Sequence, residues 1–379
     1  MAAEKNNKTL NVPNLRFPEF SGEWEKTRFE RVVSLQRGSS PRPIIEYITK
    51  SSEGVNWVKI GDMPKYGRVV TSTEEKITKE GAKKSRHVNV GDLILSNSMS
   101  YGQPYIMNIE GYIHDGWFVL KSFENSFDRD YLCNLLISPA VQNQYRRLAA
   151  GGVVQNISSD LVNSVMVSLP SIKEQHKIAS FLNLIDDRIA TQRKVIEKYE
   201  SLIRGLCEKL TRQGDTNKSI NECLECHSST LQESEVLDTG RYPVYGAIGV
   251  CGYTDTPDVS GDGILIIKDG ASVGVTYFAD GCYSSIGTLN RLTAKQGINL
   301  RYVYYCLKVM NFAPYKTGLA IPHIYFKDYG KHKIWCPSFE QQSRIADALT
   351  NIGNKIHVEK LLLEQLNSQK RYMLNQLFI

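Results

Sequence analysis

The sequence predicts an α+β protein in which two strand-rich blocks are each followed by a long helix. Three observations support this: an internal duplication, a heptad pattern in both copies, and short β-branched and aromatic runs ahead of each helix. The chain has 379 residues, of which 41% are hydrophobic and 23% charged. This composition is typical of a globular protein with two or three domains.

The duplication is visible at one constant offset of 167 residues, which takes Pro170 to Pro337. The same offset aligns Gln175 with Gln342, Ile178 with Ile345, Ala179 with Ala346, Leu182 with Leu349, and Ile185 with Ile352. Chance rarely keeps so many identities in one ungapped register. The two halves therefore derive from a repeat, whose period has to be recognised before any fold is assigned.

Each repeat ends in a predicted helix. In the first, Ser171 is the expected N-cap and Glu174 stands at the capping-box position. From Leu182 to Leu210 apolar residues recur at alternating spacings of three and four, a heptad seam that recurs from Leu349 to Leu377. Polar residues interrupt the second seam at Glu359 and Lys370. A helix of about 40 residues would be roughly 60 Å long.

Two such seams in one chain most simply pair with each other, antiparallel. Homodimerisation through parallel coiled coils is the alternative that the seam alone leaves open.

The blocks ahead of the helices share landmarks but differ between them. Strand-like runs follow the Gly-Asp turns at Gly91 and Gly261, at similar distances before each helix. Gly151 and Gly318 are again 167 residues apart, and so are Asn156 and His323. A shared framework with divergent interiors suits two modules that do the same task on different targets.

Several functions are disfavoured by the composition. The N-terminus has no apolar core of a secretory signal, and no run is long enough to span a bilayer, so we expect a cytoplasmic protein that contacts no membrane. Cys223-Leu-Glu-Cys-His227 matches a haem-attachment pattern, but no export signal accompanies it and no second ligand pair supports zinc. We expect no cofactor, no metal and no catalytic residue, because methyl-donor, Walker A and hydrolase motifs are all missing.

With this layout established, the chain resembles the specificity subunits of type I restriction-modification enzymes. The resemblance spans nearly the entire chain and rests on the order and spacing of several segments. These are Pro13–Trp24, Gly91–Ser96, Gly240–Gly246, Lys268–Gly274 and the two Pro-x-x-x-x-Gln helix starts at Pro170 and Pro337. The chain departs from a regular repeat in its shorter second block and in the charged breaks of the last seam.

The resemblance implies two target recognition domains separated by two long antiparallel coiled-coil helices. The expected boundaries are 1–170 for the first recognition domain, 171–213 for the central helical spacer, 214–336 for the second recognition domain and 337–379 for the C-terminal helical spacer. Each domain would read one half of a bipartite, asymmetric target in double-stranded DNA. The helices would set the gap and bind two methyltransferase subunits, which would carry the methyl donor and methylate adenine at N6. Separate motor and endonuclease subunits would supply ATP-dependent translocation and cleavage, so the chain alone would not be an enzyme.

Candidate DNA-binding residues fall into two kinds, because phosphate contacts position a protein and base contacts specify sequence. A basic run in the first block would neutralise phosphates, unless it is only a solvated surface loop; it consists of Lys76, Lys79, Lys83, Lys84 and Arg86. Amide, hydroxyl and charged groups of two loops would read base edges, unless these are merely polar hairpin tips; they are Asn97, Ser98, Ser100, Tyr101 and Gln103, with Lys268, Asp269 and Ser272 as the counterpart. Asn156 and His323 belong to segments that either touch DNA or simply close the domain.

Two other classes of function compete with this interpretation. A coiled-coil scaffold with two small domains would bind protein or glycan and show no sequence preference on DNA. A self-contained DNA-modifying enzyme would bind the methyl donor by itself. The net charge of +6 permits nucleic-acid binding without proving it.

Overall fold

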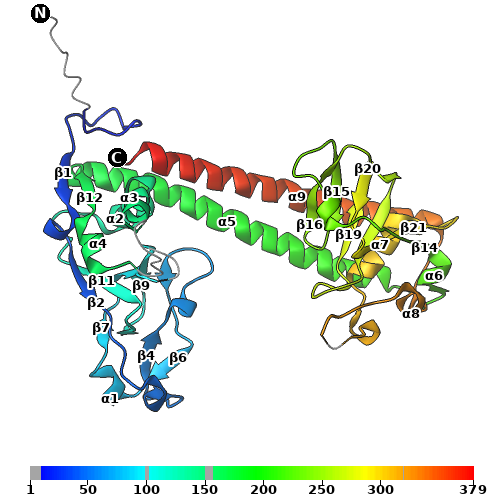
Figure 1. Ribbon diagram of the computed structural model, residues 1–379, viewed down its shortest axis with the longest axis horizontal. Coiled ribbons are helices and arrows are strands. Elements are labelled where there is room, and N and C mark those ends of the chain that lie inside the picture. The colour runs from blue at the N-terminus through cyan, green and yellow to red at the C-terminus, as the bar shows by residue number, and fades with distance from the viewer. Residues whose placement is uncertain (1–9, 99–101, 150–156, 319) are drawn as a thin grey trace, which may run out of the picture. The chain divides into compact units, whose positions relative to one another are not determined.

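The computed structural model describes residues 10–98, 102–149, 157–318 and 320–379. It divides into two compact units, one made of Met1–Arg193 with Leu362–Ile379 and the other of Lys194–Leu361. Two long helices, α5 (Ile172–Thr211) and α9 (Phe339–Gln376), contribute to both units (Figure 1). No helix in the described ranges is long and apolar enough to cross a membrane.

The first unit holds three sheets, with strand orders β1-β12, β3-β6-β4-β10-β7 and β2-β11-β8-β9-β5. The strands are β1 (Glu25–Arg28), β2 (Ser34–Arg37), β3 (Ile48–Thr49), β4 (Val55–Val58), β5 (Val69–Val70), β6 (Glu75–Ile77), β7 (Arg86–Val88), β8 (Leu93–Ser96), β9 (Pro104–Met107), β10 (Gly111–Ile113), β11 (Trp117–Lys121) and β12 (Met166–Leu169). The short helices are α1 (Lys79–Ala82), α2 (Arg129–Ile137), α3 (Pro139–Ala149) and α4 (Ser159–Ser164).

The second unit repeats this plan with fewer strands, in the orders β13-β22, β14-β21-β18-β19 and β16-β15-β20-β17. The strands are β13 (Lys218–Ser219), β14 (Leu224–Ser228), β15 (Tyr242–Gly246), β16 (Gly249–Thr254), β17 (Val259–Ser260), β18 (Gly263–Ile267), β19 (Thr276–Ala279), β20 (Cys282–Ser285), β21 (Leu289–Ala294) and β22 (Lys333–Ile334). The short helices are α6 (Ile220–Cys223), α7 (Leu300–Lys308) and α8 (Phe326–Tyr329).

The central strand of each domain is the apolar run that follows its Gly-Asp turn. Every residue of β8 and of β18 is buried, which explains why neither run alternates with polar residues. β8 lies between β11 and β9, and β18 lies between β21 and β19. The two blocks are therefore copies of one sheet arrangement, although the second is shorter.

The long helices run antiparallel within each unit, as the seam predicted. In the first unit Lys370 of α9 pairs with Asp186 of α5 at 2.5 Å. In the second unit Lys360 pairs with Glu200, and further along α5 Cys207 packs with Leu349, which comes earlier in α9. Both polar breaks in the seam are accommodated, since Glu359 is bound by Lys355 at 2.7 Å and Lys370 by Asp186.

The start of α5 differs in one detail from the predicted capping box. The Ser171 hydroxyl accepts a hydrogen bond from the Glu174 backbone N–H at 3.3 Å, as expected for an N-cap. The Glu174 carboxylate, however, receives two hydrogen bonds from Arg16, at 2.8 and 2.9 Å. Glu174 is only 2% exposed, so this pair fastens the N-terminal segment to the first helix.

A buried glutamine joins each domain to its long helix in the same way. The Gln175 side-chain oxygen accepts from the Asp128 backbone N–H at 2.8 Å, and the Gln342 oxygen accepts from the Asn299 N–H at 2.8 Å. Asp128 and Asn299 are in turn the N-caps of α2 and α7. The glutamines that mark the repeat in the sequence thus have one structural role in both copies.

Candidate nucleic-acid interface

The basic run of the first domain lies along the sheet β3-β6-β4-β10-β7 and the helix α1. Lys76 is in β6, Lys79 begins α1, and Arg86 begins β7. Two of these lysines have partners within the protein. Lys79 forms an ion pair with Glu53 at 3.3 Å, and Lys84 Nζ donates a hydrogen bond to the Tyr47 hydroxyl at 2.5 Å. Lys79, Lys83, Lys84 and Arg86 are exposed, whereas Lys76 is half-buried.

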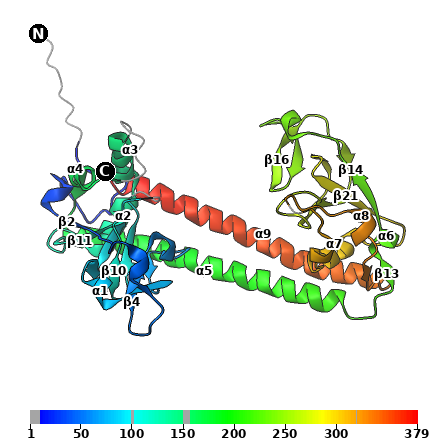
Figure 2. The ribbon, with the colours of Figure 1, turned by 60° about the horizontal axis from the view of Figure 1, so that its bottom comes forward.

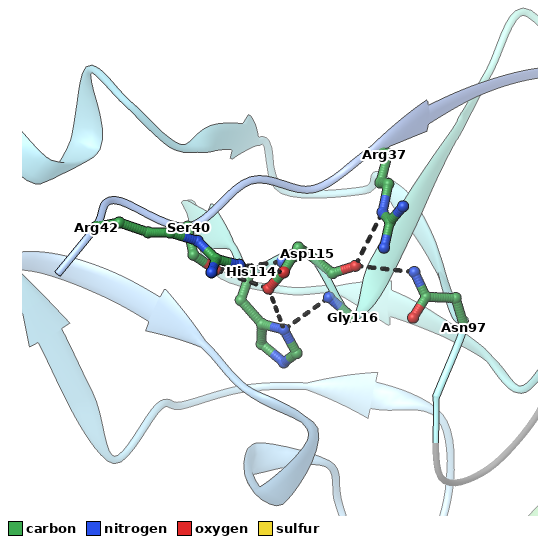
Figure 3. A network of polar contacts seen from close by, with 7 residues as sticks. All are labelled: Arg37, Ser40, Arg42, Asn97, His114, Asp115 and Gly116. Carbon is green, nitrogen blue, oxygen red and sulfur yellow. Dashed lines mark hydrogen bonds and ion pairs between the residues drawn. The ribbon is translucent and has the colours of Figure 1, made fainter. Parts of the chain in front are cut away.

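A polar turn, His114–Gly116, collects side chains from two other segments, Arg37–Arg42 and the loop that begins at Asn97 (Figure 3). The Asp115 backbone oxygen accepts from Asn97 Nδ2 at 2.9 Å and from Arg37 Nε at 3.3 Å. The Asp115 carboxylate binds Arg42 at 3.2 Å and the Ser40 hydroxyl at 2.9 Å. The turn therefore ties the polar loop after β8 to two exposed arginines.

The basic run is connected to this turn. Arg86 Nε donates to the Arg37 backbone oxygen at 3.2 Å, so the last residue of the run lies beside the first arginine of the network. Arg37 and Arg42 were missed in the sequence because they stand about 75 residues from Asp115 along the chain. Only the pairing of β2 with β11 brings them together.

His114 shapes the same turn from inside. Burial lowers its pKa, even though the neighbouring Asp115 acts in the opposite direction. Its Nδ1 accepts from the Gly116 N–H at 2.7 Å, which fits a neutral imidazole. For Asp115, burial acts to raise the pKa, but the hydrogen bond from Ser40 and the charges around it lower it overall, so the carboxylate stays ionised beside Arg42.

The Asn97–Gln103 loop is only partly described. Asn97 is 2% exposed, so in the isolated chain its amide supports the loop from within. Ser98 is half-buried, while Ser100, Tyr101 and also Asn156 lie outside the described residues. Gln103 is half-buried and lines a cleft of about 790 Å³ in the first unit, together with Arg68, Arg129 and Lys370.

In the second unit the structure brings Lys268, Asp269 and His323 together. The Asp269 carboxylate lies 2.6 Å from His323 Nδ1, and the Gly270 N–H donates to the Pro322 oxygen at 2.9 Å. The Ile324 N–H donates to the Lys268 oxygen at 2.9 Å. Ser272 is on the same loop and is exposed. The loop after β18 and the segment before α8 thus form one surface.

Backbone hydrogen bonds establish that Asn97 and Lys268 occupy equivalent places. The Asn97 N–H donates to the Gly116 oxygen at 3.0 Å, as the Lys268 N–H donates to the Thr288 oxygen at 3.0 Å. The Asn97 oxygen accepts from Ile157 at 2.7 Å, as the Lys268 oxygen accepts from Ile324. The two candidate reading loops therefore have the same framework but different side chains.

Over the described parts of the chain, no group of three or more His, Cys, Asp or Glu side chains could hold a metal ion. Cys223, the first residue of the haem-like pattern, is buried in the core, where burial raises the pKa of its thiol to about 12. His227, the last residue of that pattern, is in β14 and contacts the Thr293 hydroxyl at 2.9 Å.

Two equivalent α+β domains, each with a polar loop at the end of a buried central strand, define a duplicated protein whose copies share one framework. The chain belongs to the family described as "Type I restriction modification DNA specificity domain", which matches it twice, over residues 22–200 and 216–368. It is a type I restriction-modification specificity subunit.

Individual relatives agree with this assignment. The EcoprrI type I restriction enzyme specificity subunit of Escherichia coli is 21% identical, over 85% of this chain and 87% of its own length. The crystal structure of the type I restriction-modification S subunit from M. genitalium is similar in fold, with a TM-score of 0.63 and 19% identity, over 97% of this chain and 99% of that chain. A chain from a structural study of type I R-M complex assembly is similar over 93% of this chain, with a TM-score of 0.58 and 16% identity.

Proposed function

We propose that this chain reads a bipartite, asymmetric DNA sequence, with one recognition domain for each half. The proposed domains are residues 1–170 and 214–336, joined by the helical spacers 171–213 and 337–379. The observation that carries this proposal is the equivalence of the loops after β8 and β18. Identical backbone hydrogen bonding with Asn97 in one loop and Lys268 in the other suits two readers of different sequences.

The electrostatics of the first domain support binding to a phosphate backbone. Arg42 and Asp115 are 81% and 45% exposed, so the guanidinium of Arg42 can exchange its carboxylate partner for a phosphate at little cost. Arg37 and the basic run from Lys79 to Arg86 add further exposed cations. Binding should therefore weaken steeply as salt is raised.

The helices are proposed to set the gap between the half-sites and to dock two methyltransferase subunits. Both helices keep large apolar side chains exposed after their seam has been paired. In the first unit these include Leu184 and Tyr372, and in the second Leu202, Val358 and Leu361. Such residues are suited to burial against partner helices. Methylation, translocation and cleavage would then be performed by the methyltransferase and by the motor and endonuclease subunits.

Mapping of methylated adenines tests this proposal. The chain is co-expressed with its methyltransferase subunits, and methylated positions are mapped across the host DNA. We expect one interrupted, asymmetric motif that disappears when the chain is omitted. Methylation that persists unchanged without the chain would refute its role as the sequence reader and favour a scaffold.

Exchange of one domain tests whether the two halves are independent. Replacing residues 214–336 with the corresponding domain of another family member should change one half of the motif and leave the other half unaltered. The matched control replaces residues 1–170 and should change only the opposite half. If both halves change together in either chimaera, the two domains do not read independently.

A further inference from the structure

The segment Thr317–His323, which lies between α7 and α8 of the second unit, is closed into a hairpin by an antiparallel bridge between Thr317 and His323. Thr317 and His323 exchange both backbone hydrogen bonds, at 2.8 and 2.9 Å. Gly318 has a φ of +88°, and a Cβ there would lie 2.3 Å from the Ile321 oxygen, so only glycine fits. Leu319 is outside the described residues.

The base of this hairpin is fastened to the loop after β18. The Gly270 N–H binds the Pro322 oxygen, His323 contacts Asp269, and Ile324 is 1% exposed in the core. Only two residues separate that buried anchor from Ile321, which is 58% exposed. The hairpin thus holds an apolar side chain outward next to Lys268, Asp269 and His323.

Cationic side chains stand on both sides of this segment in the chain, Lys316 before it and Lys327 after it. Lys316 and Lys327 are exposed, and Lys327 Nζ lies 5.3 Å from the centre of the exposed Tyr325 ring. Cations beside an apolar tip suit a surface that meets phosphates at its rim and bases at its centre. In the other repeat Val154 stands 167 residues before Ile321, so that a β-branched apolar residue occupies this place twice in the sequence.

We propose that Ile321 reads a thymine in the second half-site by packing on its 5-methyl group. In the major groove the thymine methyl is the distinctive apolar group that a base pair presents, and the other base-edge groups are hydrogen-bond donors or acceptors. An isoleucine cannot hydrogen-bond, so thymine is the base that it can select. This inference rests on the proposed DNA-reading function and adds a residue and a base to it.

The test removes only the 5-methyl group of the thymine. The complex of the chain with its two methyltransferase subunits is titrated with a duplex carrying the mapped target, in which each thymine of the second half-site is replaced in turn by deoxyuridine. One replacement should weaken binding by the wild-type complex about fourfold, the worth of one buried methyl group. The Ile321→Ala complex should bind the thymine and deoxyuridine duplexes equally.

A matched control is available in the same domain. Ile248, in the turn between β15 and β16, is 89% exposed, and the Ile248→Ala complex should keep the full response to deoxyuridine. Both isoleucines are exposed, so neither change should lower the melting temperature.

The outcomes separate this inference from the function on which it rests. If no methylation motif depends on the chain, both fail. If a motif exists but its second half contains no thymine, or the wild-type complex tolerates every deoxyuridine, or Ile321→Ala retains the response, only the thymine contact is refuted.

Discussion

Replacing Gln175 with methionine should destabilise the first unit through the junction between α2 and α5. Gln175 is fully buried and makes three hydrogen bonds: its oxygen accepts from Asp128 N–H at 2.8 Å, and its nitrogen donates to the Ser126 oxygen at 2.8 Å and the Pro170 oxygen at 3.1 Å. Methionine fills a similar volume but offers no comparable donor or acceptor. The substitution therefore isolates the hydrogen bonds from the packing.

The magnitude follows from the groups left without a partner. Each buried backbone group that loses its hydrogen bond costs about 1–3 kcal/mol. The Asp128 N–H would lose its hydrogen bond completely, whereas the Ser126 and Pro170 carbonyls can recover part of theirs. The total cost in unfolding free energy is therefore about 3 kcal/mol. For a unit of this size the melting temperature should fall by roughly 6–12 °C.

The assay combines thermal unfolding with hydrogen exchange. Exchange should rise in the peptide around Asp128 and remain unchanged around Asn299, because that position depends on Gln342 in the second unit. Gln369→Met is the control, since Gln369 is exposed on α9 and surface changes usually stay within about 0.5 kcal/mol. If Gln175→Met is no more destabilising than Gln369→Met, the buried glutamine does not hold the junction.

Three further predictions concern the N-terminal segment, the buried histidine and the helices. Arg16→Ala should lower the unfolding free energy by about 3 kcal/mol, because it leaves the buried Glu174 carboxylate unpaired. Arg42→Ala, at the exposed pair with Asp115, should lower it by less than about 1 kcal/mol, and equal losses in denaturant titration would contradict this difference. Burial lowers the pKa of His114, so below about pH 6.5 the unfolded chain binds a proton more readily than the folded unit does, and stability should fall from pH 7 towards pH 5. In melting curves, His114→Asn should make stability less dependent on pH over this range, and an unchanged dependence would exclude His114 as its source. Insertion of one heptad after Arg193 in α5 and another after Leu361 in α9 lengthens each helix by about 10 Å. The gap in the methylated motif should then widen by about three base pairs, and an unaltered gap would mean that helix length does not set it.

Within the two proposed recognition domains, burial divides the predicted residues into two groups. Exposed cations such as Lys79, Lys83 and Arg86 can meet phosphates as they stand. Asn97 is bound internally, so its contribution to recognition would come through the shape of its loop. Proximity in the sequence to a polar loop therefore does not distinguish a residue that contacts DNA from one that positions its neighbours.

The amino-acid sequence by itself determined the duplication and the two long helices, and it favoured their antiparallel pairing. These features depend on local periodicity, because residues three and four apart share a helix face wherever the chain lies. Even the polar breaks at Glu359 and Lys370 could be read from the pattern, and the structure shows ion pairs at both. The equivalence of Gln175 and Gln342 was likewise visible as an identity within the repeat.

Only the tertiary structure decided which distant residues meet. The convergence of Arg37 and Arg42 on Asp115 and the contact between Asp269 and His323 both depend on strand pairing between segments far apart in the chain. Strand register is set by side-chain burial and turn geometry across the whole domain, which no local pattern encodes. The helices could thus be predicted from sequence, whereas the reading surface arises only when the sheets have formed.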